Sequence, residues 1–82
     1  MLSLNLDRQN DILYMAFSNM EQSYGDEKQN GIVIFYDFRD DTITGITIFD
    51  FIKRYKMKKL YELDLPIDIN FEQDVCSKLG LM

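Results

Sequence analysis

The stretch from Gly31 to Asp50, GIVIFYDFRDDTITGITIFD, decides the fold. Its first half is rich in β-branched and aromatic side chains, and its second half alternates threonine with isoleucine, which is typical of β-strands. The aspartates between the halves favour a turn, because their side chains bond to nearby backbone amides. We therefore predict a β-hairpin with strands over about 32–38 and 42–49. Gly45 inside the second strand indicates a bulge or a close backbone approach.

A similar hairpin precedes this one. Residues 2–6 alternate leucine with polar side chains, which predicts a strand with one solvent-exposed face. Residues 12–17 (ILYMAF) are apolar throughout, which predicts a central strand covered on both faces, or on one face by another subunit. The polar segment 18–30 between the hairpins is expected to be a long loop that could carry function or be mobile.

Helical signals follow the second hairpin. Asp50 is expected to cap a helix over about 51–58, since its side chain can accept bonds from the free amides of the first turn. Asn70 is expected to cap a second helix over 71–79, whose apolar residues recur at every fourth position. A short extended segment near Leu65 could join the edge of the sheet.

These elements predict an α+β fold in a single domain, residues 1–82. Its core is a four-stranded antiparallel β-meander of two hairpins, with one helix after the fourth strand and another at the C-terminus. A chain of this length buries only about 60% of its unfolded surface on folding. We therefore expect it to gain stability by pairing, as a homodimer or with a small protein partner.

The first residues of the sequence and its single cysteine bear on the cellular compartment in which the protein is expected. The first residues form neither a basic segment nor a long apolar run, so neither a signal peptide nor a membrane anchor is expected. Cys76 stands alone, which excludes an internal disulfide and suits a reducing environment. We expect a cytoplasmic protein in which Cys76 is a buried structural thiol.

Two segments carry a resemblance to a known family. Asp7 to Met15 (DRQNDILYM) resembles the opening motif of domain-of-unknown-function family 2283, which runs approximately Tyr-Asp-x-x-x-Asp-x-Leu-Tyr-Ile. The glycine-initiated segments GIVI, followed by Tyr-Asp, and GITIFD are similar to the second half of that family. The resemblance covers roughly residues 1–55 and implies a small β-rich domain, to which residues 56–82 add a C-terminal extension. Some members of the family are encoded beside small ribonuclease-like toxins, which implies an antitoxin-like role.

The sequence lacks the residues of common catalytic sites. It contains no histidine, which excludes imidazole acid–base chemistry, and no serine has a glycine-flanked elbow. We therefore predict a protein that is not an enzyme and needs no cofactor. The turn aspartates could bind Ca²⁺ or Mg²⁺, or act as an acid–base pair, if both hairpin turns lie at one end of the sheet. The alternative is that these aspartates only stabilise turns. They are Asp7, Asp11, Asp37, Asp40 and Asp41.

Charge is distributed unevenly along the chain. The net charge is −5, yet five of the nine basic residues fall within 53–59, which contains no acidic residue. On a helix these charges would spread around the axis. The run is a solvated helix end, a surface for an acidic partner such as a second copy, or a phosphate-binding patch with stacking from a tyrosine. The interaction candidates are Lys53, Arg54, Tyr55, Lys56, Lys58 and Lys59.

The expected function is a non-enzymatic protein-interaction module, an antitoxin-like partner of a small basic, ribonuclease-like protein. One alternative is a nucleic-acid-binding regulator that uses residues 53–59. A second alternative is a homodimeric structural protein. No membrane partner is expected.

Overall fold

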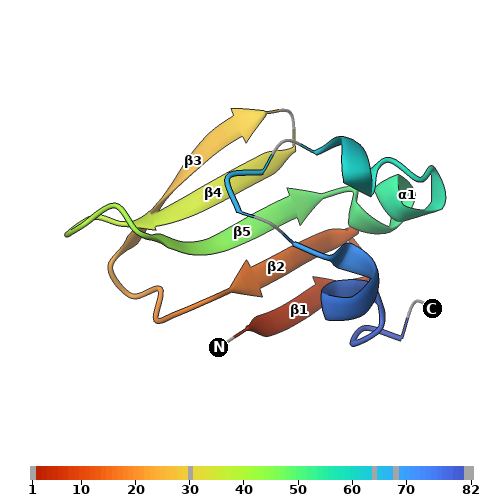
Figure 1. The fold of residues 1–82 in the computed structure, drawn as a ribbon, viewed down its shortest axis with the longest axis horizontal. Helices are drawn as coiled ribbons and strands as arrows, with labels where there is room; N and C mark the ends of the chain where they lie inside the picture. The colour runs from red at the N-terminus through yellow and green to blue at the C-terminus, as the bar shows by residue number, and fades with distance from the viewer. Residues whose placement is uncertain (1, 30, 64, 68, 81–82) are drawn as a thin grey trace.

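The structure is a computed structural model that describes residues 2–29, 31–63, 65–67 and 69–80, and its largest element is a five-stranded antiparallel sheet (Figure 1). The strands lie in the order β1-β2-β5-β4-β3. An α-helix, a 3-10 turn and a wide turn with π-type bonding follow the last strand. In chain order the elements are β1 (Ser3–Asp7), β2 (Ile12–Ala16), β3 (Ser23–Gln29), β4 (Ile32–Asp37), β5 (Ile43–Phe49), α1 (Phe51–Lys56), η1 (Leu60–Glu62) and η2 (Phe71–Cys76).

The predicted four-stranded meander is wrong. In a meander β2 would lie beside β4, whereas β2 pairs with β5, and β4 pairs with the other side of β5. Because β3 and β5 occupy both sides of β4, no side of β4 is left for β2. This order places Leu13 opposite Ile48 and Met15 opposite Ile46, and all four side chains are at most 2% exposed. Burial of apolar side chains on both sides of β5 therefore favours the observed order.

The strand that sequence reasoning missed is β3, which lies in the segment predicted to be a loop. Its sequence, SYGDEKQ, does not alternate apolar with polar residues, so periodicity gives no signal. β3 is held by its pairing with β4 and by contacts across that pair. The rings of Tyr24 and Tyr36 lie 5.6 Å apart, and the Lys28 ammonium lies 5.4 Å from the centre of the Tyr36 ring. The neighbouring strand, rather than the hydrophobicity of β3 itself, makes this segment a strand.

η1 and η2 lie over one face of the sheet, and α1 lies at the end of β5 (Figure 1). The segment between η1 and η2 crosses the same face, where Leu65, Ile67 and Ile69 pack half-buried against the core. This segment therefore covers the sheet and does not extend its edge. Cys76 is fully buried, as predicted. The buried apolar core consists of Leu13, Met15, Ile32, Ile34, Ile46, Ile48, Phe51, Leu60, Phe71, Val75 and Cys76.

The helix after β5 begins at Phe51 as predicted, but its predicted cap is wrong. Asp50 has a left-handed φ of 56° and makes no side-chain capping bond. Asp11, in the turn between β1 and β2, takes that role. Its Oδ1 accepts the Ile52 amide at 2.6 Å, and its Oδ2 accepts the Lys53 amide at 3.1 Å. A tertiary contact therefore satisfies the free amides at the start of α1.

The end of α1 is set by its backbone. Lys58 adopts a left-handed φ of 56°, and the Lys59 amide donates to the Arg54 carbonyl at 2.8 Å. This bonding pattern is that of a Schellman turn, which ends a helix and reverses the chain. α1 therefore ends at Lys56 rather than at residue 58, and Leu60 enters the core.

The predicted C-terminal helix over 71–79 is wrong in type and length, because only the wide turn η2 forms there. The Asn70 cap is confirmed, since its side-chain oxygen accepts the backbone amide three residues later at 3.1 Å. Phe71, Val75 and Cys76 are all buried, at spacings of four and five residues. The i to i+5 bonding of a π-type turn places these three side chains on one side. Within the described residues, no helix has the length and apolar character needed to cross a membrane.

Candidate interaction surfaces

In the part of the chain that the structure describes, no helical element lies on one face of the sheet (Figure 1). We call this the open face, and it presents Ile12, Tyr14, Val33, Phe35 and Phe49, which strand register and alternation place on one side. Tyr14 and Phe49 are 43% and 40% exposed, and the other three are half-buried. A contiguous exposed apolar surface is typical of a site that contacts another molecule.

A shallow hollow of about 270 Å³ lies on the open face. Aromatic and apolar side chains line most of it, and short polar side chains of β1 and β5 line the rest. Its size is close to the lower limit of small-molecule sites, so it suits one inserted side chain of a partner. The lining residues are Ser3, Asn5, Tyr14, Met15, Ala16, Met20, Phe35 and Thr47.

Gly45 lets the loop between β2 and β3 lie against one end of the open face. A Cβ at this position would be 2.6 Å from the carbonyl oxygen of Met15 and 2.8 Å from the sulfur of Met20. The register between β4 and β5 also shifts next to Gly45. The sequence-based prediction of a bulge or a close approach is therefore confirmed, and both are present.

The charges that the strands contribute to the open face are acidic, and the guanidinium of Arg54 lies beside Phe49 at its margin. Register places Glu27 on this face at the β3 edge, opposite Val33, and Asp7 at the β1 edge. Lys28, the one cation within the five strands, lies instead over the ring of Tyr36, which packs against the core. The open face thus combines an apolar centre with carboxylates at two edges.

The end of the molecule at α1 is basic. Arg8, Lys53 and Lys56 line an open hollow of about 380 Å³. The carboxylate of Asp11 also lines this hollow, where it is bonded to the first amides of α1. Sequence reasoning missed Arg8 because the turn between β1 and β2 lies far from residues 53–59 along the chain. Only the pairing of β2 with β5 brings that turn to α1.

Two of the predicted interaction residues have structural contacts. Arg54 is half-buried, and its Nε donates to the Phe49 carbonyl at 2.9 Å. Tyr55 is half-buried and packs against the core, so its ring is not a freely presented stacking surface. The exposed residues of the run that could meet a partner are Lys53, Lys56, Lys58 and Lys59.

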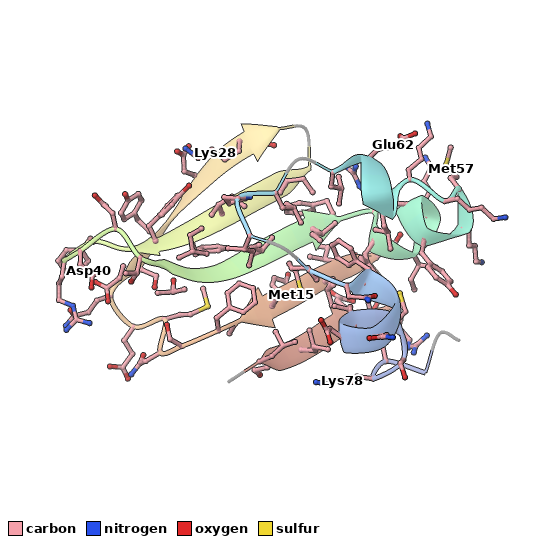
Figure 2. All side chains as sticks on the ribbon, viewed as in Figure 1. Met15, Lys28, Asp40, Met57, Glu62 and Lys78 are labelled. Carbon is pink, nitrogen blue, oxygen red and sulfur yellow. The ribbon has the colours of Figure 1, made fainter. Side chains whose placement is uncertain are left out.

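The turn aspartates lie in two groups at opposite ends of the sheet. Asp7 and Asp11 belong to the turn at the α1 end, and Asp40 marks the turn between β4 and β5 at the other end (Figure 2). The structure therefore does not bring the five candidate carboxylates together. Over the described residues, no cluster of three or more histidine, cysteine, aspartate or glutamate side chains could hold a metal ion.

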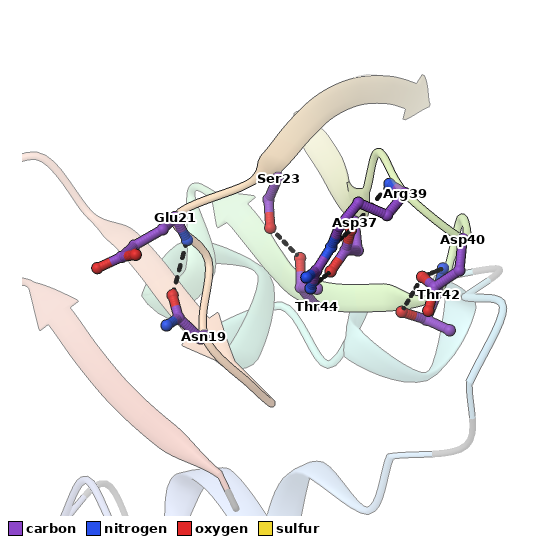
Figure 3. Close-up of polar contacts among 8 residues, drawn as sticks. All are labelled: Asn19, Glu21, Ser23, Asp37, Arg39, Asp40, Thr42 and Thr44. Carbon is purple, nitrogen blue, oxygen red and sulfur yellow. Dashed lines mark hydrogen bonds and ion pairs between the residues drawn. The ribbon is translucent and has the colours of Figure 1, made fainter.

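Asp37 and Arg39 organise the turn between β4 and β5 (Figure 3). Asp37 is only 7% exposed, and its carboxylate accepts bonds from Arg39 Nη2 at 2.6 Å, from Nε at 3.0 Å and from the backbone amide at 2.9 Å. These bonds from Arg39 lower the pKa of Asp37 from 3.8 to about 2. Beside this pair, the Ser23 and Thr44 hydroxyls share a bond of 2.7 Å. The bond between Ser23 and Thr44 connects the start of β3 to β5.

The Asp37–Arg39 pair predicts a pH dependence of stability. Because the folded pKa of Asp37 is depressed, its contribution is fully present above 3.8 and is lost as the pH falls toward about 2. We expect the difference in unfolding free energy between the wild type and Asp37→Asn to shrink across that interval, as measured by urea unfolding at a series of pH values. Asp40→Asn, in the same turn, is the control. A difference that does not change with pH would contradict the assignment.

Comparison with protein-family models, with curated proteins and with solved structures finds no match for this chain. The resemblance to domain-of-unknown-function family 2283 therefore stays a prediction. The function has to be argued from the open face and the basic end.

Proposed function

We propose that this protein is a non-enzymatic interaction module, an antitoxin-like partner of a small basic, ribonuclease-like protein, which it binds through the open face. The observation that carries this proposal is the uncovered apolar side of the sheet. Tyr14 and Phe49 expose about two fifths of their surface there, although η1, η2 and the segment between them cover the opposite side (Figure 1). Exposed aromatic side chains are the anchors that dominate many protein interfaces.

Charge supports a basic partner. The chain carries a net charge of −5, and the open face has carboxylates at its edges and no lysine or arginine from the strands. A cationic protein would be steered toward such a surface and would find complementary charges around the apolar centre. A ribonuclease-like protein fits this description, because its own substrate-binding surface must be basic to hold phosphates.

The test is a tagged pull-down from native lysate with four baits, three of which address the open face. We expect wild type and Tyr24→Lys to retain a small basic protein after nuclease treatment, and Tyr14→Lys to lose it. Tyr24 is a matched control because it is 44% exposed, against 43% for Tyr14, and its ring contacts Tyr36 away from the open face. Loss of an aromatic anchor lowers affinity by at least about thirtyfold, and the added cation repels a basic partner.

The same experiment distinguishes the second candidate function, nucleic-acid binding at the basic end. Arg8, Lys53 and Lys56 around one hollow favour this alternative. It predicts bound nucleic acid that disappears with nuclease and with Lys53→Glu/Lys56→Glu, but stays with Tyr14→Lys. That pattern would overturn the first proposal.

Once purified, the small basic protein retained by the wild-type bait is expected to lose ribonuclease activity when the chain is added.

A further inference from the structure

The two edge strands of the sheet differ in how they are protected. β3 carries Asp26, Glu27 and Lys28 in succession, and its register shifts after Glu27. Charges and irregular pairing on an edge strand discourage pairing with another chain. β1 has fewer of these features: its one charged residue is Asp7 at its end, residues 2–6 read LSLNL without charge, proline or glycine, and its pairing with β2 is regular.

The free edge of β1 presents the backbone groups of its leucines. The Phe17 amide, just after β2, donates to the Thr44 carbonyl at 2.7 Å, so odd-numbered residues of β2 direct their backbone toward β5. The even-numbered residues then face β1, where their partners are Ser3, Asn5 and Asp7. The amides and carbonyls of the two intervening leucines, at 4 and 6, therefore point outward. Within the described part of the chain, no backbone or side-chain group bonds to them.

The side chains of β1 suit the same edge. Leu4 and Leu6 are half-buried against the core, so each keeps apolar surface at the margin of the sheet. Asn5 between them is exposed on the open face. β1 lies at the lower margin of the sheet, with η2 in front of it (Figure 1). Exposed Lys78 extends past β1 in Figure 2, and its flexible stem can turn away from this edge.

We propose that β1 pairs antiparallel with β1 of a second copy of this chain, about a two-fold axis through Asn5, so that the two sheets form one continuous ten-stranded sheet. In this register Leu4 faces Leu6 of the second copy, Asn5 faces Asn5, and Ser3 faces Asp7. Each leucine then meets another leucine on the covered face, and outward amides meet outward carbonyls.

A second copy suits this edge better than a charged partner strand does. Two chains of net charge −5 repel, yet the seam itself is uncharged between residues 2 and 6, and Asp7 meets a serine. The pattern around Asn5 is self-complementary, which is what an isologous two-fold interface requires. The axis stands perpendicular to the sheet, so both open faces would lie on the same side. The pairing uses the outward backbone of β1 and not the apolar centre of the open face, although Ser3 and Asn5 at the seam also line the hollow on that face, and it does not depend on the proposed function.

Sedimentation velocity over a range of concentrations tests the pairing. Wild type is expected to sediment as a dimer of twice the 9.7 kDa chain. Leu4→Pro removes an outward amide without touching the bonds to β2, so it should remove two hydrogen bonds per dimer and raise the dissociation constant about thirtyfold. Leu4→Val, which keeps the amide and has a similar volume to proline, is the matched control and should stay dimeric. A wild type that is monomeric throughout, or a Leu4→Pro variant that dimerises as well as Leu4→Val, would overturn the proposal.

The register and the partner have their own test. Asn5→Lys and Asn5→Glu each place like charges opposite one another, so each should weaken its homodimer, whereas their mixture should form a heterodimer. Phe49→Lys, on the open face and two strands from the seam, should leave the dimer intact. A dimer that is lost with Phe49→Lys and kept with both Asn5 variants would place the interface on the open face and refute the edge pairing. Circular dichroism of each variant confirms folding.

Discussion

Replacing Phe51 with alanine is expected to lower the free energy of unfolding by about 3–5 kcal/mol. Phe51 is fully buried at the point where α1 packs on the sheet, and its ring lies 6.2 Å from that of Phe71 in η2. The truncation would leave a cavity between the sheet and both helical elements, because the backbone at α1 is tied to Asp11 and cannot collapse into it. The measurement is chemical unfolding followed by circular dichroism.

Phe38→Ala is the matched control for Phe51→Ala. Phe38 is 62% exposed in the turn after β4, so the same truncation there should change stability by no more than about 0.5 kcal/mol. If Phe51→Ala leaves too little folded protein to measure, Phe51→Leu should show a smaller loss in the same direction. Equal effects at the two phenylalanines would contradict the assignment of Phe51 to the core.

Replacing Asp11 with alanine is expected to lower the free energy of unfolding by about 2–3 kcal/mol. About 1 kcal/mol or more comes from the two lost bonds to the amides of α1, and about 1 kcal/mol from placing alanine at a left-handed φ of 55°. The expected loss is large for an exposed turn because one side chain joins the first hairpin to the helix. Urea unfolding measures it.

Asp50→Ala isolates the capping bonds. Asp50 has a left-handed φ of 56°, almost the same as that of Asp11, but makes no side-chain capping bond. Its replacement should therefore cost only the conformational part, about 1 kcal/mol. If Asp50→Ala were as destabilising as Asp11→Ala, the helix would be capped by its own sequence neighbour, as the sequence alone suggests.

The cap of α1 shows why some features of the structure could be predicted from the sequence and others could not. An aspartate directly before a helix is a frequent cap, and sequence reasoning has no means to prefer an aspartate 41 residues away. Asn70, in contrast, caps η2 as predicted, because its partner lies three residues along the chain. Local hydrogen bonds leave a sequence signal, whereas bonds across the fold do not.

The candidate surfaces show the same difference between features set by local sequence and features set by contacts across the fold. The basic run at 53–59 was evident from composition, but the contribution of Arg8 depended on which strand β2 joins. The turn aspartates were also evident, and their separation at opposite ends of the sheet became known only with the strand directions. The apolar segment 12–17 indicated cover on both faces, or on one face by another subunit. The structure covers one face, and which face stays open depended on the strand register and on where the later segments pack.

The sequence by itself determined the strands β1, β2, β4 and β5, the start of α1, the close approach at Gly45 and the burial of Cys76. Each of these depends on side-chain periodicity or on backbone preferences within a few residues. Tertiary structure alone decided the fifth strand, the order of the sheet, the wide turn at the C-terminus and the face left open. Those features depend on which segments compete for the same pairing edge and the same apolar surface, and that competition is settled by the whole chain at once.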